Sequence, residues 1–356
     1  MDVVRRACRD RGYSEAVASQ ITLNVRKSTT LVYQAKWFLF CKWCKSRGLR
    51  PSRIKPPDLA EFLMFKKEGG LKFPTLMGYK AAIVSTLKFK SKTDFNTEEI
   101  KALMKSFQQQ DLKTRNVVPA WDLSVVMDTL RKPPFEPLEA CNIKLLTYKT
   151  IFLVALATGR RVSELHAVQF DTLSWPDNKS YILCRVNPTF IAKNQIALDS
   201  QVVQPFKILA LTNSLSRGLG QERYLCPVRA VFEYMRKTDR LGLRGDKKQL
   251  FISLKPGQNT EIAKITISGW IKKLILFAYE QSQKQLGLGA KIKAHQVRAI
   301  ALSQAFYNAG SMQDILQAGT WASHNTFTSY YLSDQSHHNG RYYRLGPFIA
   351  GQKIIE

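Results

Sequence analysis

Apolar residues recur at helical spacing through the first hundred residues of the chain. The stretch "STTLVYQAKWFLFCKWCKSRG" at 28–48 carries this pattern and ends at Gly48, and "LAEFLMFKKEGG" at 59–70 and "PTLMGYKAAIVSTLKFKSK" at 74–92 repeat it. Lysines and arginines alternate with aromatic residues in all three segments. The pattern predicts an all-helical domain over residues 1–107, with its helices beginning near residue 10.

The apolar periodicity stops in the next segment of the chain. Residues 108–120 are polar and basic at first and show no helical or strand period, so they are predicted to link two domains. Helical spacing resumes at 121–131 and at 143–157. We therefore expect a second domain over residues 121–356.

Within the second domain the period changes from helix to strand and back. The segments "KSYILCRV" at 179–186 and "PFKILAL" at 205–211 alternate or run apolar over strand lengths, which predicts a small antiparallel sheet. The segment "LFISL" at 250–254 is a further candidate strand, and from Ile265 onward the pattern is helical. The predicted fold class is mainly α with a small antiparallel β-sheet (α+β), in two domains.

Charge narrows the class of partner. The 356 residues hold 54 Lys and Arg against 27 Asp and Glu, a formal net charge of +27, while 45% of residues are hydrophobic. Such a chain folds, unlike a disordered basic tail. Its positive charge favours a polyanion, with nucleic acid first and an anionic membrane surface second.

Other composition features indicate a soluble intracellular protein. No apolar run is long enough to cross a bilayer, and the N-terminal stretch lacks a signal-peptide core. Six scattered cysteines suit a reducing compartment; Cys41 and Cys44 form a CxxC without a second ligand pair, which favours core packing over a metal site. No phosphate-binding loop or metal-ligand spacing is present, so no cofactor and no metal are expected.

The segment "ATGRRVSELHAV" at 157–168 carries the first candidate chemistry. Seven apolar residues at 151–157 stop at a Thr-Gly step, and Arg160 and Arg161 follow. A break at Gly159 presents Arg161 at a helix entrance, where its guanidinium fork matches two phosphate oxygens. Pairing of Arg161 with Glu164 on the same helix face explains the residue equally well. Arg160 is then a flanking residue, facing the backbone or solvent.

Two later segments add compatible groups. In "HQVR", His295 and Arg298 lie three residues apart and share a helix face, which suits a phosphate whose charge grows in the transition state. In "TWASHNTFTSYYL" at 320–332, Trp321 precedes Tyr330 and Tyr331 in a short helix that Ser323 or Asn325 could cap. Beside two arginines and a base a phenol can attack a phosphodiester, although an aromatic core stripe also explains the tyrosines.

The order of these segments resembles that of the tyrosine recombinase, or phage integrase, family. The match begins with "TGRRVSEL" and continues with HxxR, Trp and Tyr. The similarity covers the whole chain, because a helical N-terminal core-binding domain is also expected in that family. The stretches "PFEPL", "RRVSELHAV", "TWASHNTFTSYYL" and "RLGPFIA" are most similar to recombinases of DIRS and Ngaro-type retrotransposons. This resemblance implies a mobile-element protein acting in the nucleus if the host is eukaryotic, and in the cytoplasm otherwise.

The resemblance also implies roles for the candidate residues. Arg161 and Arg298 would clamp the scissile phosphate, and His295 would assist proton transfer from the nucleophilic tyrosine. Trp321 would occupy the place often held by a second histidine, either donating its indole N–H or packing the site.

Two roles stay open between neighbouring residues. The family's general acid is a lysine on a β-hairpin, for which Lys193 fits best, with Lys179 and Lys207 as alternatives. The family pattern "TFxxxYL" selects Tyr331 as the nucleophile, whereas a spacing of nine residues from Trp321 selects Tyr330. Neighbours on a helix point about 100° apart, so only one of the two can face the phosphate.

The activity that the resemblance implies is strand exchange between duplexes of double-stranded DNA, without ATP or a metal. It would pass through a 3′-phosphotyrosyl intermediate and a Holliday junction, in a homotetramer whose tails at 345–356 dock on neighbouring protomers. Packing of this tail on its own domain is the alternative. A DNA-binding protein of the same fold that no longer cuts, and a type IB topoisomerase-like or hairpin-resolving enzyme, are the competing functions.

Overall fold

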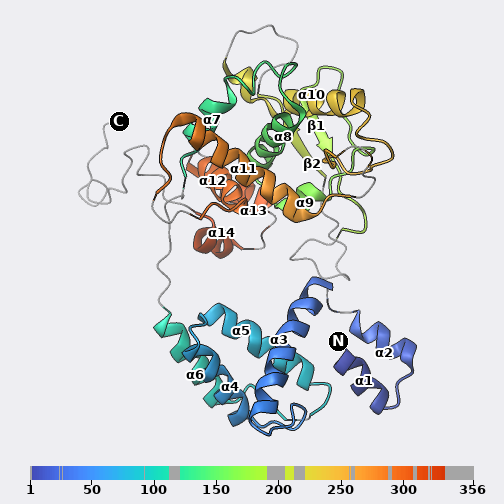
Figure 1. Cartoon of the computed structure of the whole chain (residues 1–356), viewed down its shortest axis with the longest axis vertical. Coiled ribbons are helices and arrows are strands. Elements are labelled where there is room, and N and C mark those ends of the chain that lie inside the picture. Colours follow the sequence, from blue (N-terminus) through green and yellow to red (C-terminus); the bar gives the residue numbers. More distant parts are fainter. Residues whose placement is uncertain are drawn as a thin grey trace, which may run out of the picture. The chain divides into compact units, whose positions relative to one another are not determined.

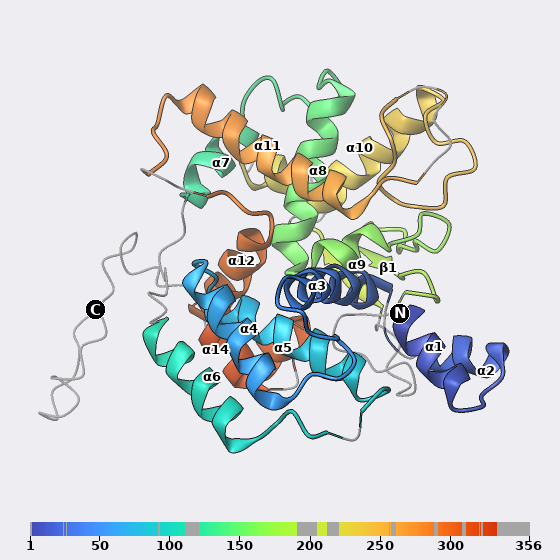
Figure 2. The same ribbon diagram turned by 60° about the horizontal axis from the view of Figure 1, so that its bottom comes forward.

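The computed structural model describes residues 2–23, 25, 27–91, 93–111, 121–190, 205–211, 221–255, 257, 261–287, 291–307, 311–319, 321 and 323–332. Figures 1 and 2 show the chain in two views, and it divides into two compact units, Met1–Arg115 and Asn116–Glu356. In the part of the chain that is described, no helix is long and apolar enough to span a bilayer.

The first unit is built from helices, as its apolar spacing predicts. They are α1 (Asp2–Asp10), α2 (Glu15–Thr22), α3 (Lys27–Ser46), α4 (Pro56–Glu68), α5 (Phe73–Leu87) and α6 (Glu98–Gln110). Helix α3 packs on α5, and the aromatic rings of Phe40 and Phe62 meet edge to face in the core, 5.0 Å apart. Cys44 is fully buried in the same core. Apolar burial on one side of each helix therefore holds this unit together.

Helix α6 corrects the predicted start of the interdomain linker. Residues 108–110 form its last turn, so the prediction that the linker begins at 108 is wrong. Asp111 then accepts hydrogen bonds from Lys67 Nζ, at 2.7 Å, and from the backbone N–H of Phe73. These contacts tie the end of α6 to α4 and α5, a stabilisation that the polar sequence "QQQD" does not reveal. Residues 112–120 lie outside the described residues.

The second unit carries the remaining elements in a mainly helical arrangement. They are α7 (Leu123–Leu130), α8 (Ile143–Thr158), α9 (Val162–His166), β1 (Tyr181–Cys184), β2 (Phe206–Leu209), the 3-10 helix η1 (Gln221–Leu225), α10 (Pro227–Arg240), α11 (Lys264–Ser282), α12 (His295–Tyr307), α13 (Met312–Gly319) and α14 (His324–Tyr330). Helix α8 packs against α10, α11 and α12, and Figure 1 shows it in the middle of this unit. Enclosure by these helices explains why residues 151–155 are apolar and buried on every side.

The two strands form the predicted antiparallel sheet. Tyr181 pairs with Leu209 and Cys184 with Phe206. The candidate strand at 250–254 is absent: Leu250 is buried, and its N–H donates to Val168 O at 2.9 Å, but the segment is irregular. A short apolar run reports burial without fixing the backbone conformation, which is why the pattern misled here.

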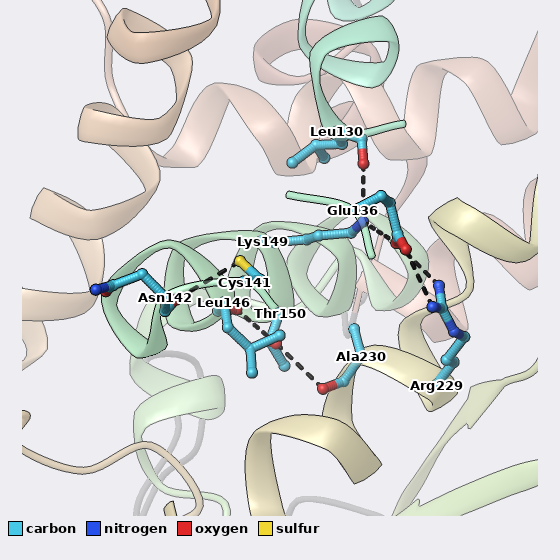
Figure 3. Close-up of polar contacts among 9 residues, drawn as sticks. All are labelled: Leu130, Glu136, Cys141, Asn142, Leu146, Lys149, Thr150, Arg229 and Ala230. Carbon is cyan, nitrogen blue, oxygen red and sulfur yellow. Dashed lines mark hydrogen bonds and ion pairs between the residues drawn. The ribbon is translucent and has the colours of Figure 1, made fainter. Parts of the chain in front are cut away.

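A buried ion cluster joins α8 to α10, as Figure 3 shows. Lys149, on α8 and fully buried, donates from Nζ to Glu136 Oε1 at 2.6 Å and to Leu130 O at 2.8 Å. Arg229, on α10, donates to both oxygens of the same carboxylate, at 2.9 and 3.0 Å. Burial lowers the pKa of Lys149, and the Glu136 carboxylate opposes that shift. The cluster therefore fixes the loop that precedes α8 to the body of the unit.

Candidate active site

The site is built at the junction of α8 and α9. Helix α8 ends at Thr158, and Gly159 adopts a left-handed conformation with φ +58°. A Cβ atom at this position would lie 2.9 Å from Leu302 Cδ2. Both the turn and the close approach therefore require glycine. The chain breaks where the Thr-Gly step predicts, and Arg161 is the residue that caps the start of α9.

Glu164 lies at the centre of the two adjacent arginines. Arg161 Nη1 donates to Glu164 Oε1 at 2.8 Å, and the Arg161 backbone N–H donates to Oε2 at 3.4 Å. Arg160 Nη1 lies 3.7 Å from the same Oε2, and the carboxylate is buried. The Arg161–Glu164 pair that the sequence offered as an alternative thus exists, and it orients Arg161 without removing it from the pocket described below.

Arg160 does not face solvent, so the expectation of a solvent-facing or backbone-facing residue is wrong. Its side chain is only 8% exposed, and its guanidinium lies 4.8 Å from the ring of Phe206 on β2. Burial lowers the pKa of Arg160, and Glu164 opposes that shift. The aromatic face and the buried carboxylate supply the attraction that draws the cation inward.

Arg298 on α12 connects three segments of the unit. Its Nη1 donates to Gly159 O at 2.6 Å and its Nη2 to Gly319 O, while its guanidinium lies 4.6 Å from the Trp321 ring and 5.3 Å from the Tyr331 ring. Its Nε–H is buried and has no acceptor among the described residues. Burial, followed by the charge of Arg161, lowers the pKa of Arg298 to about 10. One N–H donor of a firmly held cation is therefore unpaired within the described part of the chain.

An open pocket of about 780 Å³ lies in front of these groups. It is lined by Arg161, His295, Arg298 and Tyr331, which come from segments as far apart as residues 161 and 331. Tyr330 is 70% exposed and does not line the pocket. The structure thus brings together four of the residues that the sequence singled out, and only one of the two tyrosines.

Tyr331 is held in place by its backbone and its ring. Its N–H donates to Phe327 O at 2.9 Å, its carbonyl accepts from Ser303 Oγ at 3.1 Å, and its ring lies 4.5 Å from that of Trp321. Trp321 is buried and does not line the pocket, and its indole N–H has no acceptor among the described residues. A Cβ on Gly319 would clash with the Trp321 ring. Trp321 therefore packs behind Tyr331 in this structure.

His295 is the first residue of α12 and is exposed at the pocket. Partial desolvation lowers its pKa from the usual 6.5, and the charge of Lys293 lowers it further. Both effects favour the neutral imidazole at neutral pH, which is the form that accepts a proton.

The candidate lysines have different outcomes. Lys193 lies outside the described residues. Lys179 places Nζ 5.1 Å from the Phe232 ring, and Lys207 on β2 places Nζ 4.3 Å from the Tyr181 ring; neither lines the pocket. Sequence reasoning missed two exposed lysines that do line it, Lys272 on α11 and Lys293. Both precede or interrupt ordinary amphipathic patterns, so nothing in the sequence marks them.

Solved structures of similar fold are integrases and site-specific recombinases. No protein-family model and no curated protein matches the chain. The Tn1549 transposon integrase in complex with circular intermediate DNA aligns with a TM-score of 0.57 and 15% identity, covering 95% of this chain and 97% of that one.

Two further structures give the same picture. The XerH site-specific recombinase bound to a palindromic difH substrate aligns with a TM-score of 0.55 and 14% identity, over 88% of this chain and 78% of that one. A lambda integrase dimer bound to a COC′ core site aligns with a TM-score of 0.52 and 12% identity, over 90% and 74%. Since all three likenesses extend over most of the chain, the protein has the tyrosine recombinase fold.

Proposed function

We propose that this protein is a site-specific DNA recombinase that cuts and rejoins strands through a covalent 3′-phosphotyrosyl intermediate. One observation carries the proposal: Arg161, His295, Arg298 and Tyr331 line a single open pocket although up to 170 residues separate them. This set combines two phosphate-binding guanidiniums, a neutral imidazole and a phenol. The net charge of +27 supplies the affinity for the DNA backbone.

Each group has a role in the first transfer step. Arg161 and Arg298 bind the scissile phosphate, and Tyr331 Oη attacks phosphorus while the bond from phosphorus to the 5′-oxygen breaks. The phenol proton passes to His295, and the leaving 5′-oxygen takes a proton from a general acid, which we assign to Lys193. One phosphodiester bond forms as another breaks, so the step requires no nucleotide hydrolysis, and the positioned charges stabilise the transition state.

Tyr331 is the proposed nucleophile. Its ring lies against Trp321 and within 5.3 Å of the Arg298 guanidinium, and it lines the pocket, whereas Tyr330 points its exposed ring elsewhere. A nucleophile has to sit within reach of the phosphate that the arginines hold.

Strand exchange needs two duplexes and more than one protomer. We propose a homotetramer that exchanges its tails at 345–356, makes a Holliday junction when each free 5′-hydroxyl attacks the partner's phosphotyrosine, and integrates a mobile element of the DIRS or Ngaro type in the nucleus. The sequence resemblance supports this assembly, and the DNA complexes of the similar structures support binding to DNA. Deleting residues 345–356 should lower the yield of tetramer on DNA; an unchanged yield would reject tail exchange.

A covalent-trapping experiment tests the chemistry. Nicked duplexes of randomised sequence lose the short strand after cleavage, so the protein-DNA adduct persists, and sequencing the trapped DNA identifies the site. We expect an adduct with the wild type and with Tyr330→Phe, and none with Tyr331→Phe. Loss in Tyr330→Phe alone would move the nucleophile to that residue. Tight DNA binding without any adduct would instead indicate the non-cutting protein.

The trapped sequence then separates recombination from topoisomerase activity. Two labelled duplexes carrying the site should give recombinant products and a four-way junction. Relaxation of a supercoiled plasmid without exchange between duplexes would favour the topoisomerase-like alternative.

A further inference from the structure

Among the described residues, Arg160 is the one buried cation of the pocket that the reaction above does not use. It lines the pocket beside Arg161 and Arg298, and its Nη1 has no hydrogen-bond acceptor among the described residues, lying 3.7 Å from Glu164 Oε2. That atom is also shielded from solvent. Arg160 therefore cannot offer Nη1 to a phosphate in the pocket without moving, so this group acts through its charge and through its neighbour Glu164.

Charge at this place is unbalanced. The guanidiniums of Arg160, Arg161 and Arg298 lie near the single carboxylate of Glu164. With all four groups ionised, the net charge of this cluster is about +2. The charges of Arg161 and Arg160 both lower the pKa of Arg298, so the three cations repel one another. Buried positive charge of this size is costly unless an anion enters the pocket.

The contacts of Arg160 place it between two elements. Its guanidinium lies over Phe206 of β2 on one side and near Glu164 of α9 on the other. Glu164 uses Oε1 for Arg161 Nη1 and Oε2 for the Arg161 N–H and for Arg160. Arg160 thereby places a positive charge beside the Glu164 carboxylate while that carboxylate pairs with Arg161.

We propose that Arg160 is a positioning residue of the pocket: it holds Glu164 against Arg161 and adds a third positive charge beside the phosphate, while its Nη1 donates to no phosphate oxygen. The inference rests on the proposed function. A phosphodiester carries a charge of about −1, and the five-coordinate transition state of its transfer approaches −2. A pocket with one more positive charge therefore stabilises the transition state more than the bound substrate.

The test compares the rate of adduct formation with DNA affinity. At saturating nicked duplex, Arg160→Met should slow single-turnover adduct formation about 10- to 100-fold, while the Kd stays within about twofold because one charge of many is lost. Arg160→Lys should recover part of the rate because it keeps the charge. Removing mutual repulsion should leave the Tm lowered by no more than about 2 °C.

Arg236→Met is the matched control. It removes the same charge from the same unit, but Arg236 pairs with Glu233 on α10 at 2.7 Å and does not line the pocket. Its rate should equal that of the wild type.

Each possible result has a distinct meaning. A wild-type rate in Arg160→Met overturns the inference and leaves the proposed function intact. Equal slowing in Arg160→Met and Arg160→Lys, with a fall in Tm in both, also overturns it, because the residue is then only structural. A wild type that forms no adduct at all rejects the proposed function and the inference with it.

Discussion

Two buried clusters in the second unit use the same residue types and differ in what surrounds them. In one, Glu136 accepts three hydrogen bonds from Lys149 and Arg229, and Lys149 donates a further hydrogen bond to Leu130 O (Figure 3). In the other, Glu164 faces Arg160 and Arg161, and two buried N–H groups, one on Arg160 and one on Arg298, have no acceptor among the described residues.

The surroundings separate a structural ion cluster from a candidate site. The Glu136 cluster does not line the pocket of about 780 Å³, whereas the Glu164 cluster opens onto that pocket, which Tyr331 and His295 also line. Buried charges that satisfy one another stabilise a fold, and buried charges with donors left over can bind a ligand. Unpaired donors also occur away from this pocket, at Arg131 Nε and Arg244 Nε, so buried charge that opens onto a pocket is a better indicator of function here than burial or an unpaired donor alone.

The largest effect is expected when the Glu136 cluster loses its carboxylate. Glu136→Gln leaves Lys149 buried without a counter-charge, which should cost about 3–5 kcal/mol of unfolding free energy. Urea denaturation followed by circular dichroism measures it. Asp128→Asn, which removes a more exposed ion pair with Arg131, should cause no measurable change. Equal stability of the two variants would show that the Glu136 cluster contributes little.

A substitution in the Glu164 cluster should lower the activity of the protein more than its stability. Arg298→Lys keeps the charge, but the single nitrogen of lysine cannot replace both the hydrogen bonds to Gly159 O and Gly319 O and the Nε–H that faces no acceptor among the described residues. Adduct formation should therefore slow about 10²- to 10³-fold. Single-turnover assays on protein shown to be folded measure the rate. Arg229→Lys in the Glu136 cluster should lower stability and leave the rate of the folded enzyme unchanged. A slower rate in Arg229→Lys would mean that the clusters are coupled.

A backbone variant tests how rigidly the turn before the Glu164 cluster is held. Gly159→Ala forces a left-handed alanine and a contact with Leu302, so we expect a loss of about 2–3 kcal/mol from the two costs together. Gly242→Ala has a similar φ of +63° and open space around the new methyl group, so it should cost only about 1 kcal/mol. Thermal melts of both variants give the difference. Equal costs would contradict close packing at Gly159.

The smallest effect concerns pH. Because the pKa of His295 is lowered from 6.5, its imidazole is neutral at pH 7 and gains a proton as the pH falls through the lowered pKa. Adduct formation should then decrease up to about tenfold per pH unit in that acid range. His295→Asn should form the adduct more slowly at neutral pH, and its rate should not change across the acid range. A wild-type rate that stays constant down to the lowest pH at which the protein remains folded would remove His295 as the base.

Elements that depend on local patterns could be read from the sequence. The period-two segments at 179–186 and 205–211 contain the two strands, and the Thr-Gly step marks the end of α8. The spacing in "HQVR" places His295 and Arg298 on one helix, and both reach the pocket. These features depend on residues within a few positions of one another, which is why one sequence suffices for them.

The misassigned elements depend on contacts with distant residues. Residues 108–110 are helical in a helix whose end is tied by Asp111 to Lys67, and Leu250 is buried by its surroundings without a strand. Arg160 is drawn inward by Phe206, which lies 46 residues further along the chain. None of these partners can be identified from the residues next to the element.

The amino-acid order alone therefore accounts for the helices, the two strands, the left-handed turn at Gly159 and the supply of cations, imidazole and phenols. Packing of remote segments determined which of these groups meet. Arg298 reaches Gly159 across 139 residues, and Tyr331, just past the end of α14, enters the pocket while Tyr330 stays exposed. The physical reason is that side-chain direction relative to a distant partner depends on how whole helices pack, and local propensity carries no information about that.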